Sequence, residues 1–187
     1  MNHNINMEII NTPLEGLKLI KLRKFQDDRG FFIEKFKFSE FEKHGLPTHF
    51  VQENHSRSIP NVIRGLHYQF EPPQGKLVGC PRGKVYDVAV DIRKDSQTCG
   101  QWYGAELDES TLLWIPAGFA HGFCTIGNQE ADLVYKITGG QYNPSGEGGI
   151  IYNDENLNID WKIKNPVVSP KDLVLQSFEE YLLNPKF

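Results

Sequence analysis

The sequence predicts an all-β protein, built as a jelly roll or β-sandwich with a few short helices. Short stretches rich in β-branched and aromatic residues follow one another closely, with Gly, Pro, Asn and Asp between them. They do not alternate with long helical patterns, which argues against a parallel α/β sheet. The 187 residues, 39% of them hydrophobic, suit one domain. We therefore expect a single domain over residues 1–187, with residues 1–10 and the C-terminal tail at its periphery.

Each expected strand is identified by alternation of apolar and polar residues or by a short apolar run. The clearest alternation lies in residues 16–25, which we expect at the edge of a sheet. Residues 81–83 (PRG) are typical of a turn and predict a β-hairpin between the strands on either side. The expected strands are residues 16–25, 31–36, 48–56, 61–69, 76–80, 84–92, 100–107, 112–115 and 133–138.

Two helices are expected from their capping signals. Residues 39–42 (SEFE) have the spacing of a capping box, and Gly45 suits the position just past the end of a short helix. Residues 169–172 (SPKD) match a helix start with Pro at the first position, and this helix should extend to about residue 183.

Residues 61–91 combine strand-forming residues with groups that are costly to bury, namely Arg64, His67, Lys76 and Asp87. A functional site explains this pattern more readily than a structural ion pair, and the residues alone leave both open.

A single site that contains both Arg64 and His67 requires a break in the pleat of residues 61–69. Strict alternation would place the two side chains on opposite faces of the strand. Gly65 lies between them and is the expected place for a β-bulge.

Other polar strand positions have two readings. Glu34 lies among aromatic residues and either pairs with a cation such as Arg29 or binds a ligand hydroxyl. Gln52 and Asn54 either fix a ligand or face water, and Tyr135 by itself reads as a core tyrosine.

Composition argues against several classes of protein. The net charge of −4 comes without a basic run, so a nucleic-acid partner is not expected. Three cysteines without CxxC spacing suggest neither a disulfide framework nor a zinc site. The N-terminal residues lack signal-peptide features, and no apolar run is long enough for a membrane span. We expect a cytoplasmic protein without a membrane partner.

Residues 116–123 (PAGFAHGF) should form a loop that presents His121, and they resemble the second motif of the cupin superfamily. The first cupin motif places two histidines around one residue, but here His67 is followed at that spacing by Gln69. This set is poor in metal ligands, so we expect a cupin without a metal. Such a protein must stabilise negative charge with its own cations.

A longer set of motifs is similar to the dTDP-4-dehydrorhamnose 3,5-epimerase family over residues 16–175. The matching runs are DRGFFIEKF, QENHS, VIRGLHYQFEPPQGKLV, GKVYDVAVDIRKDS, WIPAGFAHGF, ADLVYK and GGIIYND. The resemblance implies a cofactor-independent, homodimeric isomerase of dTDP-rhamnose and surface-polysaccharide biosynthesis. Its substrate would be a dTDP-linked 4-keto-6-deoxy sugar, epimerised at the carbons beside the ketone.

The resemblance also implies roles for individual residues. His67 matches the general base, and Asp172 the carboxylate that orients it. Tyr135 matches the general acid, and Lys76 the cation near the 4-keto oxygen. The substrate-binding positions implied are Arg29, Glu34, Gln52, Asn54, Arg64, His121, Tyr142, Glu147 and Lys171.

One segment departs from the family pattern. The family commonly has two tyrosines shortly after the YK pair, but YKITGGQYNP is one residue longer and has Gln141 in place of the first. This bears on Tyr142 as a substrate contact and on which carbons are epimerised. The alternatives left open are a 3- or 5-epimerase of another nucleotide sugar, a 3,4-ketoisomerase and a non-catalytic sugar-nucleotide-binding cupin.

Overall fold

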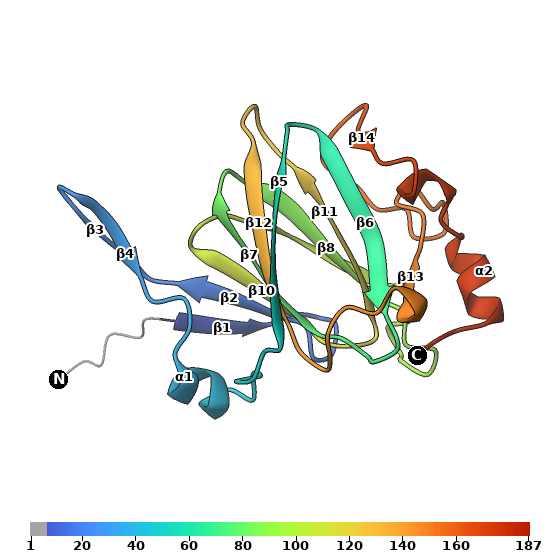
Figure 1. The fold of residues 1–187 in the computed structure, drawn as a ribbon, viewed down its shortest axis with the longest axis horizontal. Coiled ribbons are helices and arrows are strands. Elements are labelled where there is room, and N and C mark those ends of the chain that lie inside the picture. Colours follow the sequence, from blue (N-terminus) through green and yellow to red (C-terminus); the bar gives the residue numbers. More distant parts are fainter. Residues whose placement is uncertain (1–6) are drawn as a thin grey trace.

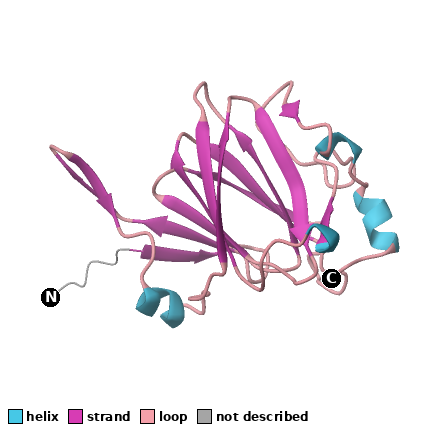
Figure 2. Cartoon of the chain, viewed as in Figure 1, coloured by secondary structure: helices cyan, strands magenta, loops and turns pink. Residues whose placement is uncertain are grey.

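Two β-sheets pack face to face in residues 7–187, the part of the chain that the computed structural model describes (Figures 1 and 2). A separate two-stranded ribbon, β3 (Lys24–Asp27) and β4 (Gly30–Ile33), projects beyond them. The all-β prediction is confirmed. In spatial order the first sheet contains β1 (Met7–Asn11), β2 (Lys18–Leu22), β10 (Thr111–Ile115), β7 (Lys76–Arg82), β12 (Ala131–Ile137) and β5 (Gln52–Ser58). The second contains β13 (Glu147–Gly149), β6 (Val62–Gln69), β11 (Phe119–Thr125), β8 (Val85–Asp91) and β9 (Trp102–Leu107), with β14 (Val167–Val168) parallel to β6.

Side-chain alternation divides each sheet into an inner and an outer face. Inner residues such as Val78, Ala89 and Leu113 form the core between the sheets. The outer face of the second sheet is covered by the C-terminal segment, where Trp161 and Tyr181 pack in a second cluster. This cover explains why every residue of β8 is buried.

The predicted bulge in β6 is confirmed. In the register with β11, His121 lies opposite His67, but Phe123 lies opposite Arg64, so β6 contains one extra residue. Gly65 has a φ of +126°, and a Cβ there would lie 2.5 Å from the Cα of Gly122. The bulge brings Arg64 and His67 to one cavity, which both of them line.

The predicted hairpin around residues 81–83 is wrong. β7 pairs with β10 and β12 in the first sheet, whereas β8 pairs with β9 and β11 in the second. The chain therefore crosses between the sheets at Gly83, whose φ is +78°. The residues predicted a tight turn correctly, but here the turn joins strands of two different sheets.

Several strand limits also differ from the prediction. Residues 16–25 divide into β2 and β3, and β2 is not an edge strand because β1 pairs with it. β1 and β14 were not expected, and β4 ends at Ile33 rather than at residue 36. β1 lies in the stretch expected at the periphery, of which residues 1–6 are outside the described residues.

The helices form where expected only in part. α1 (Phe38–Lys43) begins after Lys37 without a side-chain cap, so the predicted capping box is wrong, although Gly45 does follow the helix end. Residues 169–183 are not one helix. The 3₁₀-helix η2 (Asp172–Val174) ends at the extended Leu175, and α2 (Phe178–Leu183) starts from its own capping box. A bridge between Ile150 and Gln176 holds the chain extended at this break.

The bulge gives a testable prediction about stability. Gly65→Ala should lower the free energy of unfolding by about 3 kcal/mol, because its Cβ meets backbone atoms of β11 and its φ is positive. Gly127→Ala is the matched control, since Gly127 has a φ of +84° but nothing within 4 Å of the added Cβ. It should cost only about 1 kcal/mol. Urea denaturation measures both, and equal losses would show that β11 does not constrain Gly65.

Candidate active site

Polar side chains replace the apolar core at one end of the space between the sheets. They come from inner positions of five strands: His67 on β6, Lys76 on β7, Asp87 on β8, His121 on β11 and Tyr135 on β12. The ammonium of Lys76 lies 3.4 Å from the carbonyl oxygen of His67 and 5.9 Å from the centre of the Tyr135 ring. The fold therefore gathers residues that are far apart in the sequence.

His67 is held by a buried carboxylate. Its Nε2 lies 2.8 Å from Oδ1 of Asp172, and the second carboxylate oxygen accepts the backbone N–H of Gly65 at 3.3 Å. Burial alone would raise the pKa of Asp172, but the hydrogen bonds from His67, the Gly65 N–H and Ser169 act against it, and the pKa is lowered. The carboxylate is thus an acceptor, so Nε2 carries the proton and Nδ1 of the imidazole stays free to act as a base.

The Asp172 side chain does not cap a helix. Its backbone N–H instead donates to the carbonyl and hydroxyl oxygens of Ser169, at 3.0 and 3.1 Å. Ser169 was not predicted as a functional residue. The SPKD run carried the signal, because a capping serine fixes the turn that aims the carboxylate at β6.

Lys76 is a partly buried cation. Burial lowers its pKa to about 8, while the negative charges of Asp87 and Glu147 partly oppose this shift. An ammonium in this environment interacts strongly with any negative charge that develops nearby, because little water screens it.

His121 does not lie in a loop, as the sequence predicted, but within β11, where it is 6% exposed. Its Nε2 lies 2.9 Å from a carboxylate oxygen of Asp87, which is fully buried. Burial lowers the pKa of His121, and Asp87 opposes that shift. The sequence marked Asp87 as costly to bury but did not identify its partner, because the pairing depends on the register of β8 with β11.

Tyr135 belongs to this cluster, and Arg64 lies close enough to influence it. Burial raises the pKa of the Tyr135 phenol, and the nearby charge of Arg64 acts against the shift. Arg64 is held by β5, since its guanidinium donates to the hydroxyl of Ser58 at 3.0 Å and to the carbonyl of Arg57 at 3.1 Å. Tyr135 therefore stays protonated near neutral pH and is able to donate a proton.

Glu147 joins the loop after β12 to the C-terminal segment at the entrance of the site. Its carboxylate accepts both the Tyr142 hydroxyl and the Lys171 ammonium at 3.0 Å. These three residues and His67 line a pocket of about 280 Å³. Arg64, His67 and Lys171 line an adjoining cavity of about 400 Å³.

Two amides predicted as ligand-binding extend the same network. Gln52 donates to the side chain of Asn54 at 2.9 Å and accepts the backbone N–H of Tyr142 at 3.0 Å. Asn54 lies directly opposite Tyr135 in the register of β5 with β12. Both amides therefore belong to the site by position.

Arg29 and Glu34 are not brought into this site. Arg29 lies at the turn of the β3–β4 ribbon, on the opposite side of the sandwich from β6, and pairs with Asp27 at 2.7 Å (Figure 1). Glu34 follows the end of β4 at the root of the ribbon. Within residues 7–187, no group of three or more His, Cys, Asp or Glu residues is arranged to hold a metal ion, and no helix is long and apolar enough to cross a membrane.

Comparison with known proteins places this geometry in a family. The sequence model described as dTDP-4-dehydrorhamnose 3,5-epimerase matches residues 11–180. The chain belongs to the dTDP-4-dehydrorhamnose 3,5-epimerase family. The epimerase of Shigella flexneri is 48% identical over 176 residues, which are 92% of this chain and 96% of the relative.

Two further proteins are similar to this chain. The crystal structure of the Legionella pneumophila dTDP-6-deoxy-D-glucose-3,5-epimerase, in complex with dTDP-4-keto-L-rhamnose, has a TM-score of 0.87 and 46% identity. It covers 92% of this chain and 93% of its own. A dTDP-4-dehydrorhamnose 3-epimerase from Streptomyces niveus is 39% identical over 85% of this chain and 78% of the relative. The likeness confirms the predicted cupin jelly roll.

Burial of Lys76 gives a pH-dependent prediction. Below pH 8 the lysine is charged in the folded protein, where burial makes that charge costly. Between about 8 and 10.5 the folded protein releases this proton before the unfolded chain does, so stability rises with pH. Relative to Lys76→Met, the wild-type free energy of unfolding should rise by about 3 kcal/mol between pH 7 and 10.5.

Denaturation at a series of pH values measures this difference. Lys164→Met, at an exposed position, controls for loss of a positive charge elsewhere. A difference between wild type and Lys76→Met that stays constant with pH would contradict the buried-cation interpretation.

Proposed function

We propose that this protein is a dTDP-4-dehydrorhamnose 3,5-epimerase, which converts dTDP-4-dehydro-6-deoxy-glucose to dTDP-4-dehydro-rhamnose. The observation that carries the proposal is the His67–Asp172 pair beside a partly buried Lys76, in a member of this family. A protein that only bound the sugar nucleotide would not need an imidazole with one ring nitrogen fixed by a carboxylate and the other left free.

The proposed mechanism begins with proton removal. Nδ1 of His67 takes the proton from a carbon beside the ketone, and Asp172 stabilises the imidazolium that forms. The electron pair moves to the 4-keto oxygen and gives an enolate, whose charge the Lys76 ammonium stabilises. Tyr135 then donates its phenol proton to the same carbon from the opposite face, and solvent restores both groups. A second cycle at the other carbon completes the 3,5-epimerisation.

The remaining site residues are proposed to hold the nucleotide. Arg64 and Lys171 line the 400 Å³ cavity beside His67, where two cations suit the diphosphate. The amides of Gln52 and Asn54, with Tyr142 and Glu147, are placed to bind hydroxyl and carbonyl groups. His121, whose imidazole is held by its pair with Asp87, is proposed to contact the substrate as well. We propose a cytoplasmic setting, which fits the three unpaired cysteines.

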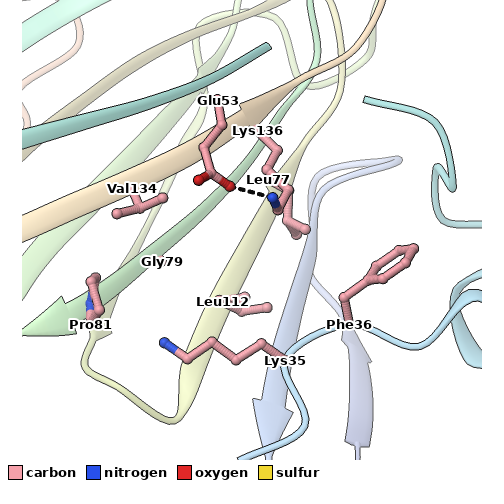
Figure 3. A pocket seen from close by; sticks show the side chains of 9 residues that line it. All are labelled: Lys35, Phe36, Glu53, Leu77, Gly79, Pro81, Leu112, Val134 and Lys136. Atoms are coloured by element: carbon pink, nitrogen blue, oxygen red, sulfur yellow. Dashed lines mark hydrogen bonds and ion pairs between the residues drawn. The ribbon is translucent and has the colours of Figure 1, made fainter. Parts of the chain in front are cut away.

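We also propose a homodimer. The β3–β4 ribbon exposes 36% of Phe25, 52% of Phe31 and 66% of Phe32, a large apolar surface for an isolated chain. On the outer face of the first sheet, Leu112 and Val134 line a hollow of about 170 Å³ (Figure 3). A second copy that covers these surfaces would also explain the position of the ribbon. Arg29 of each chain would then contact the substrate in the site of the partner subunit rather than in the site of its own chain.

A 3-epimerase is the second candidate. The Streptomyces niveus relative has that activity in its name, and the Gly139–Gly140 segment departs from the family pattern next to Tyr142. The two activities differ in how many sugar carbons exchange protons with solvent, so one experiment separates them.

Proton NMR of dTDP-4-keto-6-deoxy-glucose with the protein in D₂O tests the proposal. Deuterium should enter at C3 and C5, at a rate that a chelator leaves unchanged. His67→Ala should abolish exchange at both carbons and retain nucleotide binding, because the base is lost and the cations remain. His55→Ala, which removes a histidine near Asp132 outside the site, should exchange normally. Exchange at C3 alone would favour the 3-epimerase, and exchange by His67→Ala would exclude His67 as the base.

Complementation tests the role of the ribbon. Arg29→Ala and His67→Ala should each be impaired as homodimers. When the two variants are mixed and exchange subunits, each heterodimer contains one site with both residues intact, which restores about a quarter of the wild-type rate. If Arg29 served the site of its own chain, mixing would restore nothing.

A further inference from the structure

Gln69 ties together two loops at the entrance of the site. It lies two residues after His67, and 4% of it is exposed. Its side-chain NH₂ group donates to the carbonyl oxygens of Pro72 at 3.1 Å and Gln141 at 3.2 Å. Its carbonyl oxygen accepts the backbone N–H of Asn143 at 2.9 Å. The two residues on either side of Tyr142 are therefore both bonded to one buried amide.

Gly139 and Gly140, which depart from the family pattern, lie against the turn that contains Pro72 and Pro73. A Cβ on Gly139 would lie 2.0 Å from the carbonyl oxygen of Pro73, and one on Gly140 would lie 2.2 Å from Cγ of Pro72. A second buried amide, that of Gln74, donates to the carbonyl of Gly140 at 2.8 Å. The longer loop thus fits here only because these two positions have no side chains.

Tyr142 depends on these anchors for its position. It is 51% exposed, so packing holds it weakly. Its own contacts are the backbone N–H to Gln52 and the hydroxyl to Glu147, a group that substrate would also approach. The fixed backbone of Gln141 and Asn143 therefore determines the position of the Tyr142 ring over the pocket that Tyr142 and His67 both line.

We infer that Gln69 is a positioning residue for the epimerase, which holds Tyr142 over the substrate pocket through the backbone of Gln141 and Asn143. The inference rests on the proposed function, in which Tyr142 contacts the substrate. In this chain the position that would hold a second metal ligand in other cupins is used to fix a loop.

Removing the amide should release the loop. Gln69→Leu leaves the carbonyls of Pro72 and Gln141 and the N–H of Asn143 without their partner, so these groups move to reach water. Because Tyr142 moves with them, kcat/KM should fall about tenfold, chiefly through a higher KM. The base, acid and cation on the strands keep their positions.

A double-mutant cycle with Tyr142→Ala separates positioning from general destabilisation. If Gln69 acts through Tyr142, Tyr142→Ala alone should lower kcat/KM about tenfold, and adding Gln69→Leu should lower it less than about twofold further. Effects that multiply to about a hundredfold would overturn the inference.

The failure of the inference is distinguishable from failure of the proposed function. If Tyr142→Ala leaves kcat/KM unchanged, Tyr142 is not a substrate contact and the positioning role falls with it. Solvent exchange at the sugar carbons would still test the epimerase on its own.

Gln176→Leu is the matched control. Gln176 also donates two hydrogen bonds, to the Tyr68 hydroxyl at 3.0 Å and the Gly149 carbonyl at 3.3 Å, but it does not touch the Tyr142 loop. This variant should lower the melting temperature, and its effect on kcat/KM should multiply with that of Tyr142→Ala.

If Gln69→Leu does not fold, Gln69→Glu serves instead, since it keeps the acceptor for Asn143 and loses both donated bonds. Gln69→Glu should show the same coupling to Tyr142→Ala, and the absence of this coupling would overturn the inference.

Discussion

The carboxylate of Asp172 is the constraint on which the site depends. It satisfies the Gly65 N–H at the bulge and the imidazole of His67 at the same time. The bulge turns Arg64 and His67 toward one cavity, and Gly65 lies in the gap between the pairings of β14 and β13 with β6. One side chain thus completes the edge of a sheet and fixes the orientation of a base. This coupling explains why a C-terminal turn belongs to a site built otherwise on strands.

A polar cluster inside a sandwich costs free energy that neighbouring contacts must offset. The fully buried Asp87 pairs with His121, and the ammonium of Lys76 is attracted to Asp87 and Glu147. Among residues 7–187, no buried side-chain nitrogen or oxygen lacks a hydrogen-bond partner. The cluster is therefore compatible with a stable fold. The pKa of Lys76 remains lowered because its ammonium is poorly solvated. A poorly solvated ammonium interacts strongly with a negative charge that develops beside it.

Strands and loops contribute different precision to the site. The groups proposed for proton transfer and charge stabilisation lie on β6, β7 and β12, where the register fixes them. Two of the groups proposed to hold substrate, Tyr142 and Lys171, lie on loops, and two buried glutamines and Glu147 tie these loops to the strands. The ribbon that carries Arg29 is not tied to this site at all. A rigid reaction centre with separately anchored binding loops allows related sugars to be accommodated without change to the chemistry.

Local patterns in the chain were enough to predict the all-β class, the bulge at Gly65 and nearly every polar residue now found in the site. These follow from alternation, the freedom of glycine and the cost of burying charge, together with motifs that resemble a known family. The pairing of the strands could be read only from the folded chain. Residues 81–83 join two sheets rather than a hairpin, β1 removes the predicted edge, and His121 lies in a strand against Asp87. Sheet pairing and register depend on contacts between distant segments, and local patterns do not encode them. The same reason applies to Arg29, which lies away from the site that its motif suggested, because local patterns do not encode how the β3–β4 ribbon lies against the sandwich.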